Sequence, residues 1–268
     1  MNPTRRISAF FLCLLTLLSL LPLTACGGTR SNYKVLDVLA EERWNIAFRQ
    51  GDSIRDIVSA ALSELAASGE LARLSSEYLG DDYSCLKGEA GALETLAGQM
   101  EIPEDRVLLI GVEANSPPLS LFSGYMFSGL IPTLAEKVCG MIGWEYRLTP
   151  ILAGNAEVEL ASGNVDCVWV CEAFSEGNAI AVTPGYLENE EWLVVHRDSG
   201  ILGKRGLRDT ELAVTNEASA SKILKAAELD ETFHAIWTYG SLKECFTALD
   251  ESVCAALLAD SLTAKPLM

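Results

Sequence analysis

The stretch that decides the fold spans residues 106–197 and carries VLLIGV at residues 107–112, VDCVWV at residues 165–170 and WLVVH at residues 192–196. The first two runs are short and almost wholly apolar. This pattern is typical of strands that are buried on both faces of a parallel sheet. The third run follows a Pro/Gly corner and predicts a strand that leaves this unit.

Apolar residues at helical spacing predict a helix over residues 130–140 and a shorter one over residues 156–161, with an alternating strand over residues 144–148 between them. Alternating strands and helices predict an α/β fold with parallel strands and helices on the faces of the sheet. Ligands of open parallel sheets sit at the carboxyl ends of the strands. We therefore expect the loops after Val112 and Val170 to line one cleft.

Residues 192–268 repeat the alternation in a smaller unit. We expect strands at residues 211–215, 237–239 and 254–259, with helices between them. The sequence therefore predicts two lobes, each a βαβ sheet flanked by helices.

The first lobe resembles that of the family-three extracellular solute-binding proteins, which are the receptors of amino-acid ABC importers. The resemblance is carried, in chain order, by Ile110-Gly111-Val112 with Asn115-Ser116-Pro117-Pro118, by Ser128-Gly129-Leu130, by Ala161-Ser162-Gly163-Asn164-Val165-Asp166-Cys167 and by Thr183-Pro184-Gly185-Tyr186. It implies a two-lobed periplasmic-binding-protein type II fold that closes on a small polar solute and delivers it to an ABC transporter permease.

Residues 33–85 resemble the C-terminal end of the same family, although here they precede the first lobe. The chain ends shortly after Asp260, where the family would continue into a stretch like residues 33–48. We interpret this order as a circular permutation. In this interpretation residues 33–85 complete lobe 1, residues 86–105 are a linker, residues 106–191 form the rest of lobe 1, and residues 192–268 form lobe 2. A remnant of two tandem receptors is the alternative, in which residues 33–85 complete a neighbouring molecule by exchange.

Residues 1–25 have the features of a bacterial lipoprotein signal, with two arginines, a Leu-rich apolar run and the cleavage pattern Leu23-Thr24-Ala25-Cys26. We expect Cys26 to be lipidated, residues 26–32 to be a tether, and the protein to lie outside the cytoplasm, anchored to the cell membrane by its acyl chains. A plain secretory signal or a membrane-spanning anchor is the alternative, although the apolar run is at the short end of the spanning range.

The chain is strongly acidic. Its formal charge is −17, and it becomes −19 when residues 1–25 are removed, because they hold two arginines and no acids. Such a chain repels nucleic acid, so no nucleic-acid partner is expected.

Six cysteines follow Cys26, and export would permit disulfides between them. Cys245 and Cys254 are the first pair to test, although buried free thiols are the alternative. Two histidines and the lack of a C-x-x-C pair disfavour a metal site, and no cofactor is expected. The sequence also lacks a Ser/His/Asp order, a phosphate loop and paired catalytic carboxylates, so we do not expect an enzyme.

The family resemblance implies an arginine after the third strand that binds the carboxylate of the ligand. Residues 171–178 read CEAFSEGN here and contain no arginine. Glu172 and Glu176 would repel a carboxylate and attract a cation, unless both are solvated loop charges.

The resemblance also implies further ligand-binding residues. Asp260 matches the acceptor for the ligand ammonium, and Ser219 matches a hydroxyl at a helix start; either could instead be a helix N-cap. Ser116 stands where an aromatic residue usually stacks on the ligand. Trp169 could replace that platform, although a Trp within such a strand is more often core.

The sequence as a whole predicts a membrane-tethered receptor of an ABC importer that binds an amino acid or a small amine. The alternative is a surface lipoprotein that keeps the fold and serves as a sensor or a partner-binding module. A transglycosylase or a cyclohexadienyl-dehydratase-type enzyme is a more remote third interpretation, because related two-lobed proteins can catalyse.

Overall fold

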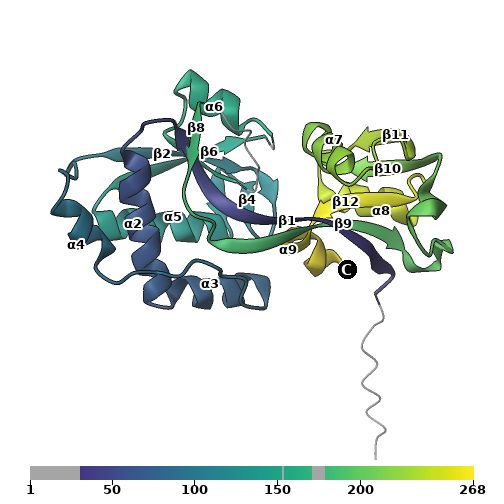
Figure 1. Ribbon diagram of the computed structural model, residues 1–268, viewed down its shortest axis with the longest axis horizontal. Helices are drawn as coiled ribbons and strands as arrows, with labels where there is room; N and C mark the ends of the chain where they lie inside the picture. Colours follow the sequence, from purple (N-terminus) through teal and green to yellow (C-terminus); the bar gives the residue numbers. More distant parts are fainter. Residues whose placement is uncertain (1–30, 153, 171–178) are drawn as a thin grey trace, which may run out of the picture. The chain divides into compact units, whose positions relative to one another are not determined.

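The computed structural model describes residues 31–152, 154–170 and 179–268, and residues 32–268 form one compact unit. Within the described ranges, no helix combines the length and the apolar character that crossing a membrane requires. The elements of this unit are drawn in Figure 1.

The main sheet is mixed. Its strands are β1 (Tyr33–Arg49), β2 (Val107–Glu113), β6 (Glu145–Ile151), β7 (Cys167–Val170), β8 (Ile180–Val182), β9 (Leu187–His196), β10 (Thr210–Val214), β11 (Phe233–Thr238) and β12 (Ala256–Asp260). Their order is β11–β10–β12–β9–β1–β7–β2–β6, with β8 pairing with β1. β2 is parallel to β6 and β7, and β10 is parallel to β11 and β12, so each predicted lobe has its parallel strands. We call the part around β2, β6 and β7 lobe 1, and the part around β10, β11 and β12 lobe 2.

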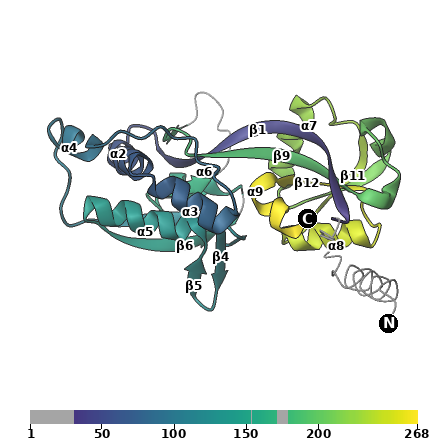
Figure 2. The same cartoon turned by 90° about the horizontal axis from the view of Figure 1, so that it is seen from below.

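The helices of lobe 1 come from two parts of the chain, one before β2 and one after it. The helices are α2 (Ile54–Ala67), α3 (Glu70–Leu79), α4 (Ala92–Ala97), α5 (Leu130–Ile142) and α6 (Ala156–Ser162). The apolar face of α2, including Ile57 and Leu62, joins Ile110 of β2 and Leu134 of α5 in one core cluster, and α2 packs against α5 (Figure 2). The N-terminal segment therefore packs on the sheet of its own chain.

Lobe 2 buries two small clusters, one on each face of its sheet. α8 (Leu242–Asp250) packs on Val194, Ala213 and Leu257, whereas α7 (Glu217–Ala226) packs on residues such as Val195 and Leu212. The two clusters draw on alternate residues of β9 and β10, as the period of two in a strand requires. The short helix α9 (Ser261–Ala264) follows β12 directly.

β1 is a long strand of 17 residues. It begins at Tyr33 and pairs antiparallel with β9 from Tyr33 to Trp44, with register shifts between Val35 and Asp37 and between Val38 and Ala40. Residues 33–85 therefore do more than complete lobe 1, because the first twelve of them run beside a strand that enters lobe 2. β1 and β9 together form the antiparallel ribbon that joins the lobes (Figure 1).

Residues 115–128 fold into a small sheet of β3 (Asn115–Ser116), β4 (Ser120–Ser123) and β5 (Met126–Ser128), where the sequence predicts only a loop after Val112. The turn between β4 and β5 places Gly124 and Tyr125 at φ of 59° and 65°, which matches a tight hairpin turn. β2 ends at Glu113, and the chain then turns back and pairs with itself through β3, β4 and β5.

Cys85, Cys139, Cys167, Cys245 and Cys254 are free thiols in this structure, and Cys171 lies outside the described residues. The disulfide considered between Cys245 and Cys254 is therefore absent. Both belong to the lobe 2 cluster packed by α8, and burial raises the pKa of Cys245 to about 12. These two cysteines behave as small apolar core residues.

Candidate functional site

Loops at the carboxyl ends of the strands of the two lobes touch one another. The Asn115 side-chain amide, just after β2, donates to the Gly240 carbonyl, just after β11, at 3.3 Å. Gly154, after β6, packs against Asn216 before α7, where an added Cβ would lie 2.6 Å from the Asn216 amide nitrogen. Strand-end loops thus meet across the lobes, which is the place where ligands of such sheets bind.

Asp260 ends β12 and caps α9. One of its carboxylate oxygens accepts hydrogen bonds from the backbone N–H of Leu262 at 2.8 Å and of Thr263 at 3.2 Å. Burial raises the pKa of Asp260 to about 7; the two N–H donors oppose the rise, and the acidic Glu113 and Glu42 add to it. The N-cap role is therefore present, and it leaves the second carboxylate oxygen for another partner.

Glu191 on β9 is a site residue that the sequence interpretation missed. It is the register partner of Asp260 on one side and of Ala40 on the other. Burial raises the pKa of Glu191 well above its usual range, and the charges of Asp260 and Glu42 raise it further. The acidic run at residues 188–191 was the available signal, but such a run in a crossing strand normally indicates solvated charges.

Ser116 and Ser219 lie near the strand ends, and each takes part in a hydrogen bond with a residue nearby in the sequence. The Ser116 hydroxyl donates to a carboxylate oxygen of Glu113 at 2.7 Å, so it orients that acid. Ser219 is not the N-cap of α7: the cap is Asn216, whose side-chain oxygen accepts from the backbone N–H of Ser219 at 3.2 Å. Ser219 itself is half-buried in the first turn, where a helix presents N–H groups to anions.

Trp169 lies in the core and offers no exposed ring face. It is 1% exposed and packs edge-on against Tyr186 with ring centroids 5.7 Å apart. The structure therefore does not support Trp169 as a platform that stacks on the ligand, since its position on β7 places the ring in the core cluster of lobe 1. Glu172, Glu176 and the lipidation candidate Cys26 lie outside the described residues.

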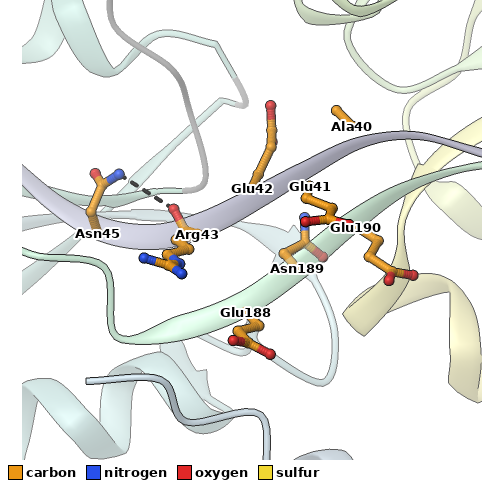
Figure 3. A pocket seen from close by; sticks show the side chains of 8 residues that line it. All are labelled: Ala40, Glu41, Glu42, Arg43, Asn45, Glu188, Asn189 and Glu190. Atoms are coloured by element: carbon orange, nitrogen blue, oxygen red, sulfur yellow. Dashed lines mark hydrogen bonds between the residues drawn. The ribbon is translucent and has the colours of Figure 1, made fainter. Parts of the chain in front are cut away.

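The β1–β9 ribbon carries a hollow of about 670 Å³, drawn in Figure 3. It is lined by Ala40, Glu41, Glu42, Arg43, Asn45, Glu188, Asn189 and Glu190. Glu188 and Glu42 point to opposite sides of the ribbon in this view. Acidic side chains thus prevail on both faces of the ribbon, with Arg43 as the cation among the lining residues.

The described residues contain no group of three or more His, Cys, Asp and Glu side chains arranged to hold a metal ion.

Comparisons with known proteins give structural likenesses alone: no protein-family model matches the chain, and no curated protein matches it. The crystal structure of Tv2483 bound to L-arginine is 22% identical with a TM-score of 0.54, and the match covers 60% of this chain and 68% of that one. An ABC uptake transporter substrate binding protein from Streptococcus pneumoniae with bound histidine is 22% identical with a TM-score of 0.53, covering 59% and 68%. The ancestral amino acid-binding protein AncCDT-1, a precursor of cyclohexadienyl dehydratase, is 19% identical with a TM-score of 0.52, covering 59% and 72%. The chain therefore has the periplasmic-binding-protein type II fold that the sequence predicts.

Proposed function

We propose that the protein is a membrane-tethered, extracytoplasmic solute receptor that closes on an amino acid or a small amine and delivers it to an ABC importer. The observation that carries this proposal is the meeting of strand-end loops from two βαβ lobes over a set of carboxylates that includes Asp260 and Glu113. Binding proteins with two lobes close about their hinge around a ligand. The amino-acid-bound structures with this fold support the same class of solute.

The solute we propose carries a positive charge. An ordinary amino-acid site also needs a cation for the ligand carboxylate, and residues 171–178 contain none. Asp260 and Glu113, at the strand ends, and Glu191, paired with Asp260, are all acidic. Each favours an ammonium or guanidinium group and disfavours a carboxylate.

The order of the chain is proposed to be a circular permutation of this fold. Tyr33 belongs to the lobe 2 cluster packed by α8, and Met268 packs against that same cluster, so the two ends of the described chain lie close enough for a short junction. The structural match covers about three fifths of the chain. Residues 106–268, the part that would remain in the usual order, make up a similar share. Packing of α2 on its own sheet supports closure within one molecule over exchange between two.

The anchor and the partner are proposed from the sequence. Lipidated Cys26 would leave only a short tether before β1, which holds the receptor beside the membrane where a permease lies. No catalytic step is proposed: the fold is shared with binding proteins, and AncCDT-1 marks the remote enzymatic alternative.

A thermal-shift screen of the purified mature chain against amino acids and diamines tests the receptor function. A saturable rise in the melting temperature with one solute is expected, because a ligand of the native state stabilises it by mass action. Asp260→Asn is the informative variant, since Asn is also a good N-cap and the fold is retained while the charge is lost. We expect the solute response to disappear in this variant and in Asp260→Ala.

A response that survives both substitutions would remove Asp260 from the site. No response to any solute would favour the second candidate, a surface lipoprotein that binds a partner protein through the same fold. The missing arginine is the observation that keeps this second candidate in view.

A further inference from the structure

Three acidic side chains share one face of the main sheet where β12 and the β1–β9 ribbon lie side by side. Asp260 is the register partner of Glu191, and Glu191 is the partner of Ala40 on β1. Glu42 lies two residues beyond Ala40 and opposite Asn189, which is two residues before Glu191. Residues paired across a ladder or spaced by two along a strand point to the same face, so Asp260, Glu191 and Glu42 project together.

Among the three, Glu191 is the one for which the described residues supply no hydrogen-bond or ion-pair partner. Its side chain is half-buried, and burial is the first cause of its raised pKa. By contrast, Asp260 is held by the first turn of α9, and Trp192 binds the neighbouring Glu190 on the other face at 2.6 Å. A desolvated carboxylate without a donor is costly, so the position calls for a proton or a cation.

The groups that face this pair from the surrounding elements are acidic as well. Glu42 approaches from β1, and Glu113 approaches Asp260 from the end of β2 in lobe 1. Both contribute to the raised pKa values of the pair, and neither neutralises it. Asn189 supplies an amide on the same face, but its oxygen already accepts from the Ser261 hydroxyl at 3.0 Å.

We propose that Asp260, Glu191 and Glu42 form a hinge subsite that holds a proton in the free protein and exchanges it for a positively charged nitrogen of the bound solute. The proton leaves the carboxyl oxygen for water or buffer, the carboxylate keeps the electron pair, and the N–H groups of the incoming ammonium or guanidinium donate to the carboxylates. No covalent bond to carbon changes. The solute class is therefore a small organic cation, and a compound with two cationic nitrogens fits a subsite that is extended by Glu113 on the lobe 1 side.

The consequence is a defined pH dependence. A carboxyl whose pKa is higher in the folded state than in the unfolded state binds more protons when folded, so stability is greatest at low pH and falls as the pH rises from about 4 towards the folded pKa. Binding of the cation should show the opposite trend, because fewer protons compete with it at higher pH.

The first experiment needs no ligand. Melting temperatures of the mature chain are measured from pH 4.5 to pH 8.5 for wild type, Glu191→Gln and Glu188→Gln. Glu188 stands on the same strand, is exposed and points to the opposite side of the ribbon from Glu42, so its substitution matches the change in net charge. We expect Glu191→Gln to lose part of the decline with pH and to melt higher than wild type at pH 8, whereas Glu188→Gln follows the wild-type curve. Identical curves for wild type and Glu191→Gln would overturn the proposal.

The second experiment uses 1,4-diaminobutane as the probe. Its stabilisation of wild type should be larger at pH 8 than at pH 6, and calorimetry at pH 7 in two buffers of different ionisation enthalpy should report release of protons on binding. Glu191→Gln should bind more weakly and release fewer protons. Diamine stabilisation that is equal at both pH values, or absent, overturns the exchange.

This inference rests on the proposed receptor function only for the solute, so the two can fail separately. A pH profile that depends on Glu191, with no response to any solute in the full screen, contradicts the receptor and the exchange while it supports the proton at the hinge. A solute response with no effect of Glu191 supports the receptor and removes the hinge subsite.

Discussion

The two halves of β1 differ in burial and in their partner strands although they belong to one strand. Residues 45–49 pair with β7 and β8, and Ile46, Ala47 and Phe48 are fully buried. Residues 33–42 pair with β9, have no second neighbouring strand among the described residues, and are mostly half-buried. A strand is therefore recognisable in sequence when it is central, and it is harder to recognise when it forms a two-stranded ribbon whose register shifts break the period of two.

The buried half should be the more sensitive to truncation. Phe48→Ala removes a fully buried ring from the main cluster of lobe 1, and a loss of about 3–5 kcal/mol in the free energy of unfolding is expected from the lost burial and the cavity. Val38→Ala on the ribbon half, where the side chain is 41% exposed, should cost less than about 1 kcal/mol. Urea unfolding of both variants measures the contrast, and equal losses would contradict the distinction between the halves.

An intermediate effect is expected where the buried half ends. The Arg49 guanidinium donates to the carbonyls of Leu160 at 3.0 Å and Val165 at 2.7 Å, and lies 3.4 Å from a carboxylate oxygen of Asp166. Arg49→Met should cost about 1–2 kcal/mol, because two carbonyls lose a charged donor while the side chain is partly exposed. Arg49→Lys keeps the charge without the fork and should fall between wild type and Arg49→Met in the same unfolding assay. A full rescue by lysine would show that the charge alone matters.

A smaller change is expected at the start of the ribbon half. The Tyr33 hydroxyl donates to the Asp250 carboxylate at 2.8 Å, while its ring packs on Phe246 with centroids 4.6 Å apart. Tyr33→Phe keeps the ring contact and loses the hydrogen bond, so about 1 kcal/mol of unfolding free energy should be lost at pH 7. Burial and Asp250 raise the pKa of Tyr33 to about 12, so a spectrophotometric titration should show one fewer late-ionising tyrosine in the variant. An unchanged titration would contradict the contact.

The sequence predicted much of each lobe because its signals were local. Buried apolar runs indicated β2 and β7, and helical spacing indicated α5 and α6, since both patterns report burial directly. The ribbon half of β1 was missed because its register shifts, between Val35 and Asp37 and between Val38 and Ala40, break the regular alternation of apolar and polar residues. The hairpin of β4 and β5 was missed because the prolines indicate a loop and carry no information about how the residues after that loop pair.

The site was only partly predictable for a different reason. Asp260 stood out by resemblance and by its place at the end of an apolar strand. Glu191 gained its meaning from pairing with Asp260 and Ala40, which lie 69 and 151 residues away along the chain. A register between strands from opposite ends of the sequence cannot be read from either strand alone, and the same holds for Trp169, whose neighbours decide whether its ring is covered.

The place where β1 begins has a mechanical consequence. Tyr33 is the first residue of the strand that joins the two lobes, and its hydrogen bonds with β9 continue without a loop into the hinge. A load applied to the chain ahead of Asn32 would therefore act along β1 and pull the β1–β9 ladder in shear, the direction in which many hydrogen bonds resist together. Tension on the leading end would reach the hinge through backbone alone.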